Sequence, residues 1–244
     1  MVLDCFSYTS VGGRNENQDS VTAVGGKSSG LFVVADGLGG HRMGNLASQA
    51  VTRAMEIEYE KMQKISKDQL SESIQKANEA VLSIQKENQC TAKSTAAVLE
   101  IQEDTAVWAN VGDSRVYYIH NGVLNSVTED HSVAYKKYKS GEITKEEIAK
   151  DEDQSSLLRS LGNETRWKPN LYDTEALSPN DGFLLCSDGL WEYSTDEEIL
   201  GSFLESETAE QWAGQLIRQV EIKAESGNDN YSVIAVRIGQ SQLK

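Results

Sequence analysis

Four aspartates in this chain lie next to apolar stretches that are typical of β-strands. Three follow such stretches, in LFVVADGLGG, VWANVGDSRVYY and GFLLCSDGLWE, and the fourth comes just before one, in SGNDNYSVIAVRI. They are Asp36, Asp113, Asp188 and Asp229. Because strand ends meet at one edge of a sheet, we expect these side chains to gather there. Neighbouring carboxylates repel each other unless cations lie between them, so the pattern predicts a site for divalent ions.

The elements that must position these acids can be predicted from periodicity. Strand-like runs precede two helical patterns, and the second of these has an apolar stripe that should cover a sheet. The expected strands are about 2–9, 19–24 and 30–35, and the expected helices are about 43–62 and 67–89.

From residue 94 onward the chain again combines strand-like runs with helical patterns. The runs STAAVLEIQ, TAVWANVG, SRVYYIH and VLNSV indicate an antiparallel meander, and 131–161 is a polar, helix-prone insertion. Strands at about 170–176 and 182–187, helices near 195–204 and 208–224, and a last strand YSVIAVRI follow. We therefore predict an α+β fold, a four-layer α/β/β/α sandwich of two antiparallel sheets, formed by one domain over 1–244.

Composition narrows the classes of partner. The chain has 244 residues and a formal net charge of −15, which disfavours nucleic acid and anionic membrane surfaces. Three cysteines, at Cys5, Cys90 and Cys186, indicate no disulfide framework and fit a reducing compartment, with Cys5 and Cys186 expected in the core. The first residues resemble neither a signal peptide nor a membrane span. We expect a cytoplasmic protein.

Seven short motifs, taken together, identify a resemblance. In order they are GGRNENQD at 12–19, VADGLGGH at 34–41, STAAV at 94–98, NVGDSRVYY at 110–118, TEDHS at 128–132, CSDGLWE at 186–192 and NDNYSVIAV at 228–236. The chain resembles the metal-dependent protein phosphatases of the PPM, or type 2C, serine/threonine class, in the bacterial-like subgroup. The resemblance covers nearly the whole length.

The resemblance implies a centre of two metal ions. Asp36 would bridge them, with the main-chain oxygen of Gly37 on the first ion and Asp188 and Asp229 on the second. Oxygen ligands favour Mn²⁺ or Mg²⁺. Two such ions would activate a shared water or hydroxide for attack on phosphorus, and the chain shows no convincing protein nucleophile that would offer another route.

Three residues near the N-terminus resemble further parts of that centre. Asp19 matches the acid that holds metal-bound water, and Gln18 stands where many members have glutamate. Arg14 matches the phosphate-binding arginine, and its planar fork suits two phosphoryl oxygens. The alternative for Arg14 is a solvated loop position.

Two acids are candidates for a third metal site shared with Asp188. They are Asp113 and Glu192, although Glu192 stands where the family commonly has aspartate. The alternative for Asp113 is an acid that caps its own turn.

The general acid is the open part of the resemblance. Eukaryotic relatives carry a histidine directly after the DG pair, whereas this chain has Leu38 there and His41 three residues later. His41 is a candidate general acid, and a metal-bound water is the alternative. We expect His131 to fix the start of the insertion and His120 to be a turn residue.

The function that the resemblance implies is hydrolysis of phosphoserine and phosphothreonine in proteins. The 131–161 insertion would form a mobile flap that selects phosphorylated proteins, with a rigid helical pair as the alternative. A cognate eukaryotic-like Ser/Thr kinase is the expected counterpart, and we expect a monomer. Two alternatives stay open: a non-catalytic pseudophosphatase that senses phosphopeptides or metal, and a phosphatase dedicated to one secretion or sigma-factor assembly.

Overall fold

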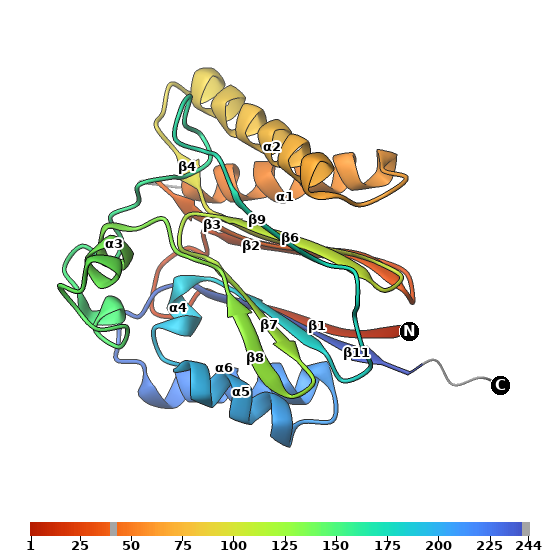
Figure 1. Cartoon of the computed structure of the whole chain (residues 1–244). Helices are drawn as coiled ribbons and strands as arrows, with labels where there is room; N and C mark the ends of the chain where they lie inside the picture. The colour runs from red at the N-terminus through yellow and green to blue at the C-terminus, as the bar shows by residue number, and fades with distance from the viewer. Residues whose placement is uncertain (40–42, 241–244) are drawn as a thin grey trace.

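Two antiparallel sheets lie face to face, and helices cover the outer face of each (Figure 1). The computed structural model describes residues 1–39 and 43–240. One apolar core fills the space between the sheets, and another lies beneath each helical layer. The predicted α/β/β/α sandwich is confirmed.

Neighbouring strands in both sheets run antiparallel. The first sheet has the order β1 (Val2–Ser10), β11 (Tyr231–Gly239), β10 (Gly182–Cys186), β7 (Arg115–His120) and β8 (Val123–Val127). The second has the order β2 (Asp19–Gly25), β3 (Ser29–Leu38), β5 (Ala96–Gln102), β6 (Thr105–Val111) and β9 (Asn170–Thr174), with β4 (Lys93–Ser94) paired to β3.

Two long helices cover the second sheet and two shorter ones cover the first (Figure 1). The former are α1 (Met43–Lys61) and α2 (Lys67–Asn88), and the latter are α5 (Asp196–Glu205) and α6 (Ala209–Lys223). The remaining helical segments are α3 (Val133–Ser140), the 3₁₀ turn η1 (Ile148–Lys150) and α4 (Asp188–Trp191).

The central strands are apolar on both faces because each sheet is covered on both sides. In β11, Val233 and Ala235 pack beneath α5 and α6, whereas Ile234 and Val236 pack between the sheets. This double burial explains why β11 is an almost unbroken apolar run instead of a simple alternation.

Helix α2 shows how local signals set an element. Ser66 caps its N-terminus by accepting a hydrogen bond from the Gln69 N–H, which satisfies a donor that the helix leaves unpaired. Its buried stripe contains Leu70, Ile74 and Val81, as the periodicity predicted.

The expected meander is wrong, because the chain changes sheets between β6 and β7. β5 and β6 form a hairpin in the second sheet, and β7 and β8 form a hairpin in the first. Gly112 makes the crossing with a φ of +92°, and a Cβ there would lie 2.7 Å from the Thr95 side chain. The crossing puts Asp113 at the end of the sandwich.

The insertion at 131–161 is less helical than its composition suggested. It contains α3 and η1, and the rest is turns and loop. Its two ends are tied together, because Val133 N–H donates to Ser156 O and Leu158 N–H donates to His131 O. The segment therefore projects from the sandwich as a closed excursion (Figure 1).

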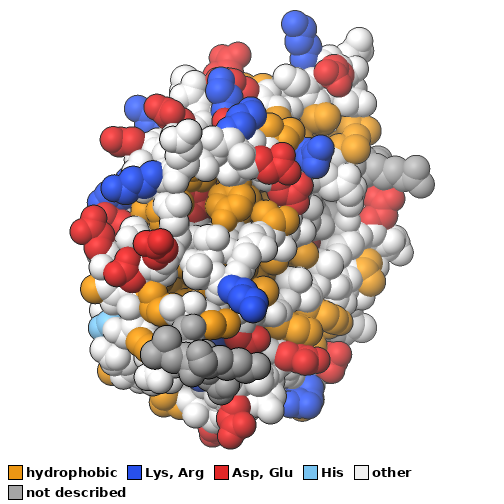
Figure 2. Space-filling view, turned by 90° about the vertical axis from the view of Figure 1, so that its right-hand side faces the viewer, with side chains coloured by type: hydrophobic (Ala, Val, Ile, Leu, Met, Phe, Trp, Pro, Cys, Tyr) orange, Lys and Arg blue, Asp and Glu red, His pale blue; other side chains and the backbone are white. Residues whose placement is uncertain are grey.

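The acidic side chains are not concentrated in a single patch on the face that Figure 2 shows. On the side where both termini lie in Figure 1, acidic, basic and hydrophobic side chains are interspersed (Figure 2). Cys186 is buried as expected, but Cys5 is exposed because β1 is an edge strand. No helix within the described ranges is both long enough and apolar enough to span a membrane.

Candidate active site

An acid-lined cleft of about 910 Å³ opens at one end of the sandwich. Asp36 and Gly37 reach it from β3, Asp188 from the start of α4, and Asp229 from the segment before β11. The two sheets thus supply acids from opposite sides of the same opening. The predicted gathering of aspartates is confirmed for these three, although they come from two sheets and not from the edge of one.

Hydrogen bonds of the main chain set the direction of Asp36. Its N–H donates to Thr95 Oγ1 at 2.9 Å, and its carbonyl accepts from Thr95 N–H at 2.8 Å and from Ser94 Oγ at 3.0 Å. Asp19 lies directly opposite Asp36 in the β2–β3 pair. Directly paired residues share one face of a sheet, so both carboxylates point to the same side.

Burial and mutual repulsion both act on these acids. Burial raises the pKa of Asp36 well above its usual value, and the charges of Asp19 and Asp188 raise it further. Burial, then the charges of Asp229 and Asp19, raise the pKa of Asp188 to about 7. Burial also raises the pKa of Asp19 to about 6. A bound cation would relieve this repulsion.

The donor set fits a hard divalent cation. All the candidate groups are oxygens, and the Oδ1 atom of Asp19 is buried without a hydrogen-bond partner. Within 1–39 and 43–240, however, no group of three or more acidic, histidine or cysteine side chains is arranged so that it could hold a metal ion as it stands. The acids instead line an open cleft, and Asp229 is engaged by an arginine.

That arginine is Arg14, the predicted phosphate-binding residue. Its Nε donates to Asp229 Oδ1 at 3.1 Å and its Nη2 donates to Oδ2 at 2.9 Å, and both side chains are partly exposed. The structure therefore places the guanidinium at the cleft, next to a predicted metal ligand. Its planar fork grips a carboxylate in the geometry that would suit a phosphoryl group.

Gly37 is required here for packing as well as for any ligand role. A Cβ at this position would lie 2.0 Å from the carbonyl oxygen of Gly44, at the start of α1. Its N–H donates to Gln18 O at 3.1 Å. The Gln18 side chain donates to Gly39 O at 3.1 Å and lines the cleft.

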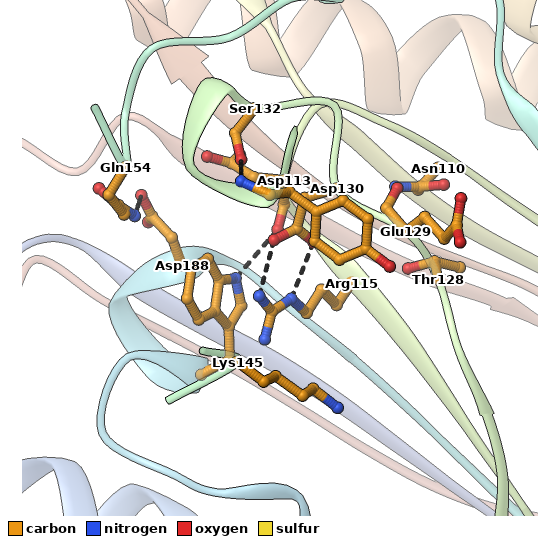
Figure 3. Close-up of polar contacts among 12 residues, drawn as sticks. Asn110, Asp113, Arg115, Thr128, Glu129, Asp130, Ser132, Lys145, Gln154 and Asp188 are labelled. Atoms are coloured by element: carbon orange, nitrogen blue, oxygen red, sulfur yellow. Dashed lines mark hydrogen bonds and ion pairs between the residues drawn. The ribbon is translucent and has the colours of Figure 1, made fainter. Parts of the chain in front are cut away.

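Asp113 lies beside Asp188 on the crossing between the sheets and is almost fully buried. Its carbonyl accepts from the Trp191 indole N–H at 2.9 Å, and the Arg115 guanidinium lies 3.6 Å from the centre of that indole ring. Arg115 in turn makes a buried bidentate pair with Asp130 (Figure 3). Asp113 is therefore held by packing from the first sheet.

Glu192, the other candidate for a third site, caps the C-terminal end of α4. Burial, and then the charges of Asp188 and Asp229, raise its pKa to about 8. The side chain thus shares the electrostatic environment of the predicted metal ligands.

The histidines have separate positions. His131 anchors the start of the insertion as predicted, since its N–H donates to Gly112 O at 2.9 Å and its Nδ1 accepts from Gly112 N–H at 3.1 Å. Burial lowers its pKa to about 4, which keeps the ring neutral and able to accept. His120 ends β7 and bonds the buried Asp181 at 3.0 Å. His41 lies outside the described residues.

Two residues near the acids were missed by sequence reasoning. Gln154 of the insertion directs its amide to Asp188 Oδ2 at 3.4 Å (Figure 3). Asn230 accepts from Gln18 N–H at 2.8 Å and donates to Val11 O and Glu16 O. Only its position after Asp229 in the NDN motif could have indicated this anchoring role.

Comparisons with known proteins agree with the fold. The family model described as protein phosphatase 2C matches residues 12–225. The serine/threonine phosphatase stp of Listeria monocytogenes is 32% identical over 231 residues, which cover 91% of this chain and 90% of that protein.

Solved structures extend this similarity to the whole sandwich. The Mycobacterium tuberculosis serine/threonine phosphatase PstP/Ppp superposes with a TM-score of 0.85 at 28% identity, covering 98% of this chain and 100% of that one. The PstP catalytic domain in complex with two manganese ions has a TM-score of 0.84 at 27% identity, covering 98% and 99%.

This chain therefore belongs to the protein phosphatase 2C family, whose members are metal-dependent. Within that family it is a serine/threonine protein phosphatase.

Proposed function

We propose that this phosphatase hydrolyses phosphoserine and phosphothreonine in proteins at the acid-lined cleft, with two divalent ions. The observation that carries the proposal is the convergence of Asp36, Asp188 and Asp229 from both sheets, where burial and the neighbouring acids raise the pKa values of Asp36 and Asp188. When bound, two Mn²⁺ or Mg²⁺ ions supply a water or hydroxide nucleophile and a clamp for the phosphoryl oxygens.

The residues around the cleft have separate proposed roles in holding the two ions and their water. Asp36 would bridge the two ions, the Gly37 carbonyl would serve the first, and Asp188 and Asp229 would serve the second. Asp19, with its unpaired Oδ1, would hold a water of the centre. These roles account for why the acids are gathered in spite of their repulsion.

Arg14 is proposed to orient the phosphoryl group. Its pair with Asp229 is largely exposed, and exposed pairs of this kind contribute about 1 kcal/mol or less. A substrate phosphate can therefore replace the carboxylate at the same fork without a large penalty. Binding of the phosphate by Arg14 would also free Asp229 for a cation.

The insertion at 131–161 is proposed to act as a flap of a single catalytic domain. Ser155 lines the cleft and Gln154 bonds Asp188, so the segment already contacts the acids. Its remaining surface would select among phosphorylated proteins, with a cognate Ser/Thr kinase as the opposing enzyme. A monomeric state, a cytoplasmic location, a third metal ion at Asp113 and Glu192, and the general acid stay predictions.

The test is hydrolysis of p-nitrophenyl phosphate and of a phosphothreonine peptide by the purified chain. Each substrate is measured with Mn²⁺, with Mg²⁺ and with excess EDTA. We expect turnover with at least one metal, loss in EDTA and recovery when that metal is added back in excess. Equal turnover in EDTA would contradict the two-metal proposal, and metal binding without turnover would favour a phosphopeptide sensor.

A further inference from the structure

Asp19 lies where the two sheets meet behind the cleft. It begins β2 of the second sheet, whereas Ser187 follows β10 and Ser232 lies in β11, both in the first sheet. The two serines are fully buried and Asp19 is 6% exposed. A side-chain contact among these three residues therefore joins one sheet to the other.

Both serine hydroxyls donate to one oxygen of Asp19. Ser187 Oγ lies 2.7 Å and Ser232 Oγ lies 2.6 Å from Asp19 Oδ2. Distances this short are typical of hydroxyl groups that donate to an ionised carboxylate. The Oδ1 atom of the same carboxylate has no hydrogen-bond partner and is buried.

The surroundings of the serines determine which way their protons point. The N–H of Ser232 donates to Ser187 Oγ at 3.0 Å, so the Ser187 proton is left for Asp19. Ser232 Oγ also lies 2.8 Å from Thr9 Oγ1, which accepts from the Asn17 amide at 2.7 Å. Ser232 Oγ carries a single proton, and its 2.6 Å contact with the Asp19 carboxylate is shorter than its 2.8 Å contact with Thr9 Oγ1, so that proton is directed mainly to Asp19.

The carboxylate is thereby held in one orientation. Rotation about its last bond would break two short hydrogen bonds to Oδ2 and deprive both hydroxyl protons of their carboxylate acceptor, which is unfavourable. Asp36 lies directly opposite Asp19 across the β2–β3 pair, on the side of the cleft acids. Oδ1, the oxygen without a hydrogen-bond donor, is therefore the one left for a ligand on this side.

We propose that Ser187 and Ser232 are positioning residues for the metal centre. They hold Asp19 by its Oδ2 atom and present Oδ1 to a divalent ion or its water, and they fix the two ligand-bearing sheets relative to each other. The proposal rests on the proposed function only in that the cleft binds a divalent cation. Neither serine contacts the substrate in this scheme.

The test is Mn²⁺ binding by the full chain, measured from the electron paramagnetic resonance signal of free Mn²⁺. The variants are Ser187→Ala, Ser232→Ala and the double variant. The matched control is Ser202→Ala, a buried serine of α5 whose hydroxyl donates to Ile199 O. Mutation of a hydrogen-bond partner of a metal ligand typically lowers metal affinity by about 10- to 100-fold. We expect about tenfold weaker binding for the double variant, smaller losses for the single variants and none for the control.

If the two serines had a purely structural role, their substitution would lower the free energy of unfolding without a specific loss of Mn²⁺ affinity. Urea unfolding in EDTA reports the stability of the metal-free chain, and we expect the two single variants and Ser202→Ala to lose similar amounts there. Wild-type Mn²⁺ affinity in the double variant would overturn the proposal, and so would an equal affinity loss in Ser202→Ala.

Thr9→Val provides a second route if the double variant does not fold. Thr9 is exposed, and its replacement removes the Oγ1 atom that accepts from both Ser232 Oγ and the Asn17 amide. We expect about a two- to threefold loss of Mn²⁺ affinity, less than for a direct partner of Asp19, because Thr9 acts only through Ser232 and Asn17. Unchanged affinity in Thr9→Val and in both single variants would overturn the proposal. Absence of Mn²⁺ binding by the wild-type chain would overturn it together with the proposed function.

Discussion

Within the described residues, carboxyl groups whose pKa is raised by burial occur in two regions, and their surroundings differ. At the cleft, Asp36 and Asp188 have raised pKa values because of burial and because other acids lie beside them. In the core beneath α1 and α2, Glu100 stands alone on β5, on the same face as Val98. It is fully buried, neither of its carboxylate oxygens has a partner, and burial alone raises its pKa to about 7.

The two regions differ in whether a cation can reach the buried carboxyl groups. A cation can approach the cleft acids from solvent and relieve both burial and repulsion at once. No such ligand has access to Glu100, so protonation is the only relief available to it. Raised pKa values are therefore informative about function when several acids share an opening, and about stability when one acid is enclosed.

The largest effect is expected from Asp36→Asn, which tests the cleft side of the comparison. The amide removes the proposed bridging charge, and we expect metal-dependent turnover of p-nitrophenyl phosphate to fall by at least about a thousandfold, or roughly 4 kcal/mol of transition-state stabilisation. Asp173→Asn, at an exposed acid paired with Lys67, serves as control. Full activity of Asp36→Asn would refute the site assignment.

Glu100→Gln tests the enclosed side of the comparison. With a folded pKa of about 7 and an ordinary value of 4.5, the unfolded chain ionises first as the pH rises. The contribution of Glu100 to the free energy of unfolding is therefore fully present below about pH 4.5 and is lost by about pH 7. The total change is about 3 kcal/mol.

Urea unfolding of the wild-type chain and Glu100→Gln in EDTA, at pH 5 and pH 8, measures this linkage. We expect Glu100→Gln to gain stability relative to wild type as the pH rises, and the exposed control Glu175→Gln to gain none. A constant difference between Glu100→Gln and wild type at the two pH values would show that Glu100 does not titrate between them.

Arg14→Lys sharpens the account of the cleft by keeping the charge and removing the planar fork. We expect kcat/KM for p-nitrophenyl phosphate to fall about tenfold, because a lysine cannot contact two phosphoryl oxygens in the same plane. Arg53→Lys, at an exposed arginine of α1, is the matched control. Unchanged kinetics would assign Arg14 to its pair with Asp229 and not to phosphate.

The smallest effect is expected from Glu192→Ala. If this acid serves only a third site, the variant keeps two bound Mn²⁺ ions, and its rate or metal dependence changes by a few-fold, about 1 kcal/mol. Mn²⁺ stoichiometry together with the dependence of turnover on Mn²⁺ concentration measures both quantities. Loss of a tightly bound ion would move Glu192 into the main centre.

Much of the architecture could be predicted from local signals. The apolar stripe of α2 indicates a helix through its period, whereas the apolar runs of β3, β5 and β11 indicate strands through their short length and β-branched residues. The assignment of strands to sheets could not be predicted in the same way. β6 and β7 are consecutive and were expected to pair, but the turn at Gly112 carries the chain across the sandwich.

The candidate site also has features that the sequence predicted and features that only the structure shows. The motifs around Asp36, Asp188 and Asp229 were recognisable in the sequence, and the structure brings these acids to one cleft. The Arg14 pair with Asp229 and the contact of Gln154 with Asp188 depend on side chains far apart in the chain. No local pattern reports such contacts.

The sequence by itself determined the acids, the elements that carry them and the family, because these depend on residue type and short-range order. The tertiary structure decided which oxygen of Asp19 is free and which is held by Ser187 and Ser232. It also decided that Glu100 is enclosed, whereas the cleft acids are open to ions. The physical reason is that access and hydrogen-bond direction are set by how two sheets meet, which no single strand specifies.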